Sequence, residues 1–258
     1  VIMNTPVTGL MAADGQTITS VKTPEQEYQA DFVISTMPLK ELVGGLEAPK
    51  PNAIKRIAHG LQYRDFITVG LLLTELKLIN PDATPIRDNW IYIQEPEVQV
   101  GRLQIFNNWS PYLTHDPEKI WVGLEYFCNE GDELWSLSEA EMQALAIREL
   151  EAIDIITTEA VQDAVVIKTP KAYPAYFGSY DRIDELRAYL DGFANLFCIG
   201  RNGMHKYNNQ DHSMLAAMAA VDNIALGRSD KENIWHVNTE QEYHEARGTS
   251  EEPPARRG

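Results

Sequence analysis

The sequence predicts an α+β fold, in which a mixed and largely antiparallel sheet carries helices on one face. Four apolar, strand-like segments lie at 66–73, 90–94, 102–109 and 119–127, and the turns between them contain Pro, Asp or Gly. Successive strands joined by such turns favour antiparallel pairing. A helix-start pattern follows at Ser138. With 44% apolar residues among 258, the chain can bury a substantial core.

The N-terminal part is predicted to be β structure. The opening run VIMNTPVTGLM (1–11) is apolar, and the turn at 13–16 has a glycine where positive φ is needed. The alternating segment 17–23 predicts a second strand. A third, at 31–36, is short and apolar like a strand buried on both faces, and it ends before Pro38, which cannot donate to a ladder.

Helices are predicted at 49–62, from Ser138 to about Ile153, and at 183–193, with a strand at 161–169. The second of these helices carries a capping box, because Ser138 can accept from the amide three residues on while Glu141 reaches back.

The C-terminal part contains a predicted strand at 196–200 that breaks at a glycine, then a polar loop. An alanine- and methionine-rich helix is expected from Asp211 to about Leu226. The tail from Gly248 has almost no apolar content and is expected to be disordered.

Charge and cysteine content narrow the function classes. The formal net charge is −16 and the pI about 4.7, so phosphate backbones and anionic lipid surfaces are repelled, and we expect no nucleic-acid or membrane partner. Cys128 and Cys198 are two isolated thiols in apolar surroundings. They indicate neither a disulfide framework nor a metal site. The longest apolar run, 66–73, is too short to span a bilayer. We therefore expect a soluble, cytoplasmic protein.

The segment 196–224 is the most informative part of the sequence. A buried strand ends at Gly200, and a dense polar loop leads to a helix whose first amides lack internal partners and lie at the positive end of the helix dipole. Gly200 and Gly203 remove side chains where a flat ligand approaches. Simple capping by Asp211 and Ser213 explains the same helix start without a ligand. His205 and His212 lie seven residues apart, which is not a metal-ligand spacing, so no metal site is predicted.

Two motifs in this chain resemble a known family. The pattern GR-x-G-x-x-x-Y-x-x-x-D at 200–211, followed by an alanine-rich helix, resembles the C-terminal flavin-binding segment of the flavin amine oxidases and protoporphyrinogen oxidases, which UDP-galactopyranose mutases share. The segment ADFVISTMPL at 30–39 is similar to the family's strand AD-x-VI-x-T-x-P. The resemblance covers residues 1 to about 245.

The resemblance implies FAD as the cofactor. Gly200 and Arg201 are then expected against the flavin and its phosphates, and the start of the following helix is expected to face the pyrimidine end of the ring. Val7 matches the position whose backbone meets the adenine. The implied cofactor-binding residues are Val7, Thr36, Pro38, Gly200, Arg201, Tyr207, Asn209, Gln210 and Asp211.

The resemblance also implies how the chain is divided. Residues 1–48 and 191–226 are expected to be pieces of a Rossmann-like FAD domain, 49–190 a substrate domain, and 227–258 a tail. No G-x-G-x-x-G loop is present, and Val1 opens directly on a strand-like run. We therefore expect a C-terminal portion whose partner is a missing N-terminal FAD-binding half. On its own this chain is expected to hold FAD weakly or not at all and to be inactive.

Three functions remain open at this point. The first is an oxidoreductase that transfers a hydride from an amine or related small molecule to the flavin, with Arg102, Trp109 and Tyr126 as candidate substrate-binding residues and no catalytic residue identified. The second is a flavin-dependent sugar mutase, which needs arginines to clamp a diphosphate. Its candidates are Arg64, Arg102 and Arg182. The third is a non-catalytic binding module.

Overall fold

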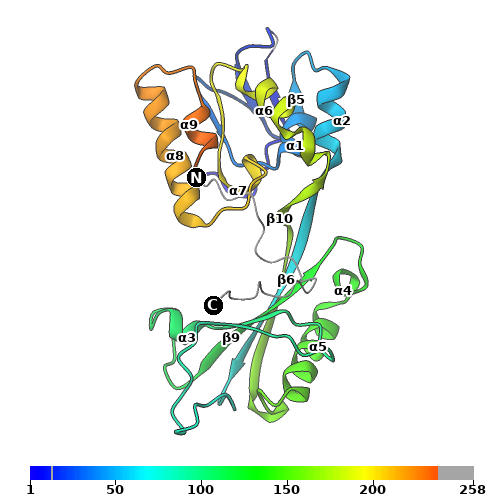
Figure 1. The fold of residues 1–258 in the computed structure, drawn as a ribbon, viewed down its shortest axis with the longest axis vertical. Helices are drawn as coiled ribbons and strands as arrows, with labels where there is room; N and C mark the ends of the chain where they lie inside the picture. Colours follow the sequence, from blue (N-terminus) through cyan, green and yellow to red (C-terminus); the bar gives the residue numbers. More distant parts are fainter. Residues whose placement is uncertain (13, 238–258) are drawn as a thin grey trace, which may run out of the picture. The chain divides into compact units, whose positions relative to one another are not determined.

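The computed structural model describes residues 1–12 and 14–237 (Figure 1). The chain divides into two compact units. The first contains Val1–Leu61 and the chain from Tyr176 onward, and the second contains Gln62–Ala175. Two long strands, β6 (Leu61–Leu73) and β10 (Val161–Gly178), carry the chain from one unit to the other and back.

The first unit contains a four-stranded sheet in the order β3-β2-β1-β5. Neighbours pair antiparallel except β1 and β5, which are parallel. Only the end of the apolar opening run is a strand, so the strand predicted at 1–11 is shorter than expected. The strands are β1 (Gly9–Met11), β2 (Ser20–Lys22), β3 (Glu27–Gln29) and β5 (Leu46–Glu47).

A second, two-stranded sheet joins segments that are far apart in the sequence. Strand β4 (Val33–Ser35) pairs in parallel with β11 (Leu196–Cys198), which confirms both predicted strands. The pairing continues one step further, because the Ile199 N–H donates to the Ser35 carbonyl at 2.9 Å. The carboxyl ends of the two strands therefore lie together, where Thr36 and Gly200 follow them.

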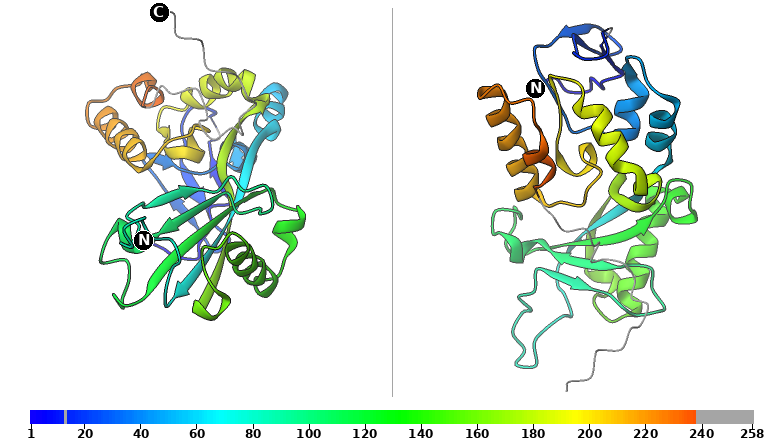
Figure 2. Two further views of the ribbon diagram at one scale, coloured as in Figure 1. Left: turned by 60° about the horizontal axis from the view of Figure 1, so that its bottom comes forward. Right: turned by 45° about the horizontal axis from the view of Figure 1, so that its top comes forward.

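Helices make up most of the rest of the first unit (Figure 2). The predicted helices at 49–62, 183–193 and 211–226 are confirmed. The helix α1 was not predicted. It begins directly after Pro38 and packs on α2, which in turn contacts α6. The helical elements are α1 (Leu39–Gly45), α2 (Asn52–Gly60), η2 (Ser179–Arg182), α6 (Ile183–Asp191), α7 (Gly200–Gly203), α8 (Gln210–Ala225) and α9 (Glu232–Trp235).

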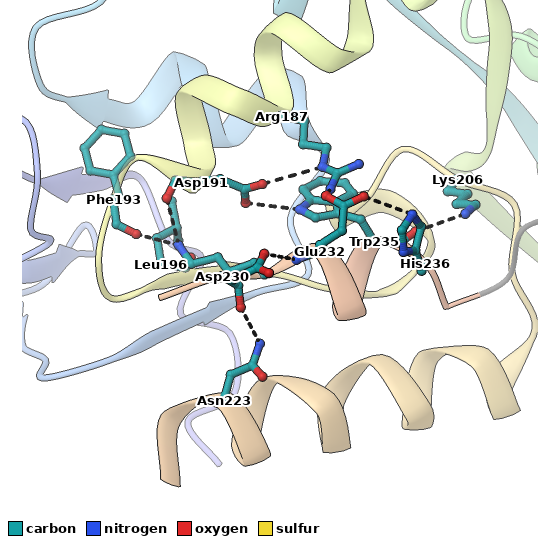
Figure 3. A network of polar contacts seen from close by, with 11 residues as sticks. Arg187, Asp191, Phe193, Leu196, Lys206, Asn223, Asp230, Glu232, Trp235 and His236 are labelled. Atoms are coloured by element: carbon teal, nitrogen blue, oxygen red, sulfur yellow. Dashed lines mark hydrogen bonds and ion pairs between the residues drawn. The ribbon is translucent and has the colours of Figure 1, made fainter. Parts of the chain in front are cut away.

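The segment 228–237, which we call the clasp, fastens the end of α6 to β11 (Figure 3). Lys231 is 3% exposed, and its ammonium donates to the carbonyls of Asp191, Phe193 and Leu196. The Trp235 indole donates to the Asp191 carboxylate at 3.1 Å. The start of the predicted tail is thus packed structure, while the disorder expected from 248 falls outside the described residues.

The second unit is built on a five-stranded sheet in the order β10-β6-β9-β8-β7. The β6–β9 pair is antiparallel over nine residues, from Asp65 opposite Cys128 to Leu73 opposite Ile120. Strand β10 contains Pro170 and Pro174, which the sheet tolerates because β10 is an edge strand. The other strands are β7 (Trp90–Tyr92), β8 (Arg102–Ile105) and β9 (Ile120–Cys128).

One face of this sheet is covered by α5 (Glu139–Ala152). Alternate residues of β6, β8 and β9 form a buried core with Met142 and Leu150 of this helix. The predicted α+β class, with a mainly antiparallel sheet and a helix on one face, is confirmed. The predicted capping box is present, since the Glu141 amide donates to Ser138 Oγ and the Ser138 amide donates to the Glu141 carboxylate. Shorter elements are α3 (Phe106–Trp109), α4 (Glu133–Ser136) and η1 (Thr158–Ala160).

The prediction of a strand at 102–109 is correct for its first half and wrong for its second half. After Ile105 the chain turns into the short helix α3. Asn107 and Asn108 stabilise this turn, because their side-chain amides donate to carbonyls of neighbouring loops. None of the helices in the described part of the chain combines the length and apolar character needed to cross a bilayer.

Candidate functional site

The two glycines of the 200–211 motif are required for different reasons. Gly200 has φ +75°, and a Cβ there would lie 3.8 Å from Thr36 and 3.9 Å from Ser213, so backbone conformation rather than space selects glycine. At Gly203 a Cβ would lie 2.6 Å from the Ser35 carbonyl oxygen. Glycine therefore lets α7 lie directly against the end of β4, which fixes the turn beside Thr36.

Arg201 holds the loop that follows α7. Its Nε and Nη2 donate to the Asn208 carbonyl at 3.0 and 2.9 Å, and its guanidinium lies 4.9 Å from the centre of the Tyr207 ring. The Tyr207 N–H donates to the Tyr176 hydroxyl at 2.6 Å. Two residues of the predicted cofactor set, Arg201 and Tyr207, thus determine the conformation of the polar loop.

Three aromatic side chains back this loop. Tyr176 stacks on Tyr180 with ring centres 4.6 Å apart, and His205 lies 5.9 Å from Tyr180. Burial raises the pKa of both tyrosines, so they remain neutral hydrogen-bonding groups. The contribution of Tyr180 was not predicted, because it precedes the motif by twenty residues and comes from η2.

The start of α8 presents hydrogen-bond donors. Asn209 is the N-cap residue, and its N–H donates to His212 Nδ1 at 3.2 Å. Ser213 Oγ donates to the side-chain oxygen of Asn208, which is 3% exposed. The amides of Gln210 and Asp211 donate no hydrogen bond to any residue that the structure describes. Two N–H groups therefore remain available at the positive end of this helix.

An open pocket of about 420 Å³ lies at this helix start. Its lining includes three members of the predicted cofactor set, Arg201, Asn209 and Gln210. The other three lining residues do not belong to that set. The lining residues are Arg201, Asn208, Asn209, Gln210, Ser213 and Met214.

The other predicted cofactor residues lie around or away from the pocket. Thr36 neighbours Gly200, and Pro38 is the N-cap residue of α1. Asp211 is exposed, with its carboxylate 3.3 Å from His212 Nδ1. Val7 precedes β1 and is not among the residues that line the pocket.

The second unit has a polar cluster on the sheet face opposite α5. Arg102 is 1% exposed and Glu125 3%, and the two form an ion pair across the β8–β9 register. Arg102 Nη2 also donates to the Tyr173 hydroxyl at 2.9 Å, and Gln104 donates to Glu125. Each buried charge therefore faces the opposite charge and takes part in one further hydrogen bond, which lowers the cost of burying it.

Aromatic rings surround this ion pair. The guanidinium of Arg102 lies 4.6 Å from the ring centre of Trp90 and 4.7 Å from that of Phe127. Trp90 stacks on Tyr92 at 6.4 Å and meets Trp109 edge-on at 6.2 Å. Trp90, Tyr92 and Trp109 keep 40%, 59% and 47% of their surface exposed, so they form a platform beside a buried cation.

Tyr126 lies on the other face of the sheet. Side chains alternate along β9, so Glu125 points away from α5 while Tyr126 enters the helix-covered core. Its hydroxyl donates to Glu149 at 3.0 Å, and burial together with the charge of Glu149 raises its pKa. The structure thus brings Arg102 and Trp109 together on one face and separates Tyr126 from them.

Comparisons with protein-family models and with curated proteins give no match. Solved structures with the same fold include a reduced UDP-galactopyranose mutase, with 17% identity, a TM-score of 0.71 and coverage of 90% of this chain and 48% of the other. A protein from Exiguobacterium sp. 255-15 assigned as a protoporphyrinogen oxidase has 18% identity, a TM-score of 0.58, and coverage of 77% and 42%. Wild-type putrescine oxidase bound to putrescine has 15% identity, a TM-score of 0.57, and coverage of 87% and 49%.

These likenesses establish the fold. The chain spans about half the length of the solved structures that it matches. The predicted resemblance to amine oxidases, protoporphyrinogen oxidases and UDP-galactopyranose mutases is confirmed at this level.

Proposed function

We propose that this chain is part of an FAD-dependent oxidoreductase that transfers a hydride from a small-molecule substrate to the flavin. The observation that carries the proposal is the open pocket at the start of α8, lined by Arg201, Asn209 and Gln210, in the motif that resembles a flavin-binding segment. The fold shared with putrescine oxidase and the other solved structures supports it.

The donors at the pocket suit an electron-rich ring edge. The amides of Gln210 and Asp211 have no partner in the described part of the chain, and they lie where the dipole of the 16-residue helix α8 is positive. Negative charge that develops on a reduced ring is stabilised at such a position. When bound, FAD supplies the hydride acceptor, and the residues of this chain hold and polarise it.

The second unit is proposed as the substrate side. The ring platform formed by Trp90, Tyr92 and Trp109 offers apolar contact, while the Arg102–Glu125 pair fixes its inner surface. The formal charge of −16 favours a cationic substrate such as an amine over an anionic one. The second unit, Gln62–Ala175, lies within the predicted substrate segment 49–190, and the assignment of residues 1–48 and 191–226 to the flavin belongs to the same proposal.

The sugar mutase hypothesis depends on arginines that can clamp a diphosphate. Arg182 donates two hydrogen bonds to Glu185, at 2.7 and 2.8 Å, and Arg102 is paired with Glu125. Two of the three candidate arginines therefore have their charge matched by a carboxylate already. The oxidoreductase is the better supported of the two functions.

The test begins with two forms of the protein. FAD is titrated into the 258-residue chain and followed by quenching of flavin fluorescence, and we expect weak or no binding because no pyrophosphate loop is present. The chain is then co-produced with a nucleotide-binding half that carries this loop, and the visible spectrum is recorded. Anaerobic bleaching by an amine supports the proposal. Conversion of a UDP-sugar without net bleaching supports a mutase, and no flavin in either form refutes both.

The role of the α8 amides is tested by Gln210→Pro. Proline is well tolerated at the first helical position, and Asn209 already has the extended conformation that proline requires before it. The substitution removes one N–H and is expected to lower the reduction potential of the bound flavin. Glu139→Pro, at the same position of α5, is the matched control and is expected to leave the potential unchanged. Equal potentials in both variants would contradict a flavin at this helix.

A further inference from the structure

A second pocket, away from the 200–211 loop, is lined by residues of α1, of α2 and of the connection between them. The two helices are labelled in Figure 1. Its volume is about 470 Å³, which is in the range of small-ligand sites. Four basic side chains line it: Lys40 from α1, Lys50 from the connection, and Lys55 and His59 from α2. Its apolar wall is formed by Val43 and Ala58.

The lining of this pocket carries positive charge and no negative charge. No Asp or Glu is among the lining residues, and Glu47 is engaged with Lys22 at 2.8 Å. The side chains of Lys40, Lys55 and His59 make no hydrogen bond or ion pair within residues 1–12 and 14–237. Elsewhere the chain is strongly acidic, with a formal charge of −16, so this is a local reversal of sign.

Lys50 is held in place by the end of α1. Its ammonium donates to the Val43 carbonyl at 2.8 Å and to the Leu46 carbonyl, where the helix ends. Burial lowers the pKa of Lys50, and the positive charge of Lys55 lowers it further against a smaller opposing effect of Glu47. Two like charges are thus close enough to repel each other, and an anion between them relieves that repulsion.

We propose that this pocket binds a small, freely soluble diphosphate-containing molecule. Lys40, Lys50 and Lys55 supply charge-assisted hydrogen bonds to the phosphate oxygens, and Val43 with Ala58 contacts the uncharged remainder of the ligand. The volume exceeds what a single phosphate group fills, which favours a diphosphate with an organic substituent. This site is separate from the residues proposed for the flavin.

The proposal is tested by titrating inorganic pyrophosphate into the full chain by isothermal calorimetry at low ionic strength. The double variant K40Q/K55Q is expected to bind at least about tenfold more weakly. The control K77Q/K119Q removes the same charge, with one exposed and one half-buried lysine as in the first pair, and is expected to bind like wild type. No binding by wild type, or equal weakening in both variants, overturns the proposal.

A second pair of variants separates the site from general charge. Gly44 lines the pocket, and a Cβ there would meet no atom within 4 Å, so larger side chains are accommodated. Gly44→Glu places a carboxylate at the pocket and is expected to abolish pyrophosphate binding, whereas the isosteric Gly44→Gln retains it. Identical affinity in these two variants contradicts the assignment.

Discussion

Replacing Lys231 by methionine removes one ammonium group from the interior of the first unit. The group belongs to a buried residue of the clasp, and its Nζ lies 2.5 Å from the Phe193 carbonyl oxygen and 2.8 Å from that of Leu196. A third acceptor, the Asp191 carbonyl, is 3.3 Å away. Asp191 is the last residue of α6, Phe193 lies in the connection, and Leu196 is the first residue of β11. Lys231 therefore joins the helix, the connection and the strand (Figure 3).

The expected loss of stability in Lys231→Met follows from the number of hydrogen bonds removed and from the cost of burying the ammonium group. A hydrogen bond from a charged donor contributes about 1.5–3 kcal/mol, and Lys231 makes two short ones. Burial lowers the pKa of Lys231, which shows that the charged form already bears a desolvation cost. Methionine keeps the length of the side chain and its contact with Phe197. We therefore expect a net loss of about 2–4 kcal/mol in the unfolding free energy of the first unit.

Hydrogen exchange at the amides of β11 and α6 measures this loss locally. Protection is expected to fall by about 30-fold to 1,000-fold in Lys231→Met. Lys206→Met is the control, because Lys206 donates to Trp235 and Val237 of the same clasp at 3.2 and 3.5 Å and is only half buried. A much smaller effect is expected there. If the two variants lose equal protection, or if Lys231→Met loses none, the lysine does not fasten the unit as described.

Two further perturbations test the interior and the glycine turn. Burial raises the pKa of the Cys198 thiol from 9.0 to about 12, so its contribution to stability is complete below pH 9 and is lost as the pH rises toward 12. As the pH rises from 8 to 10, the free energy of unfolding measured in urea should fall by about 1.4 kcal/mol less in Cys198→Ala than in wild type. An identical fall in both proteins would argue against a buried thiol. Gly203→Ala should destabilise the first unit, whereas Gly44→Ala in open space should stabilise it by about 0.5–1 kcal/mol. The melting temperatures of the two variants are compared with that of wild type. Shifts of both melting temperatures in the same direction would contradict the close contact between residue 203 and Ser35.

Local signals predicted the elements whose causes are local. The capping box at Ser138, the helical spacing of the apolar residues in α2 and the alanine- and methionine-rich composition of α8 each specify an element within one segment. The helix α1 was missed because it is seven residues long and ends in two glycines, Gly44 and Gly45, which weaken any helical pattern. The clasp was missed because Lys231 and Trp235 are buried by partners about 40 residues earlier.

Some parts of the candidate site likewise have local causes, and others depend on residues far away in the sequence. The turn at Gly200 is contained in one segment, so its glycines and the helix after it were visible in the sequence. The substrate-side cluster depends on register, because Arg102 meets Glu125 only through the β8–β9 pairing. Alternation along β9 separates Glu125 from Tyr126, but which of the two points toward α5 is decided by tertiary packing.

The distribution of cations follows from these contacts. Arg102 and Arg182 each face a carboxylate at hydrogen-bonding distance. The Arg102 pair supports the aromatic platform, and the Arg182 pair stabilises the start of α6. Lys40 and Lys55 have no such partner in the described ranges. An anion entering this acidic chain is therefore attracted to the α1–α2 pocket and not to the platform of the second unit. The two proposals therefore place the recognition of negative groups in the first unit and that of uncharged or cationic groups in the second.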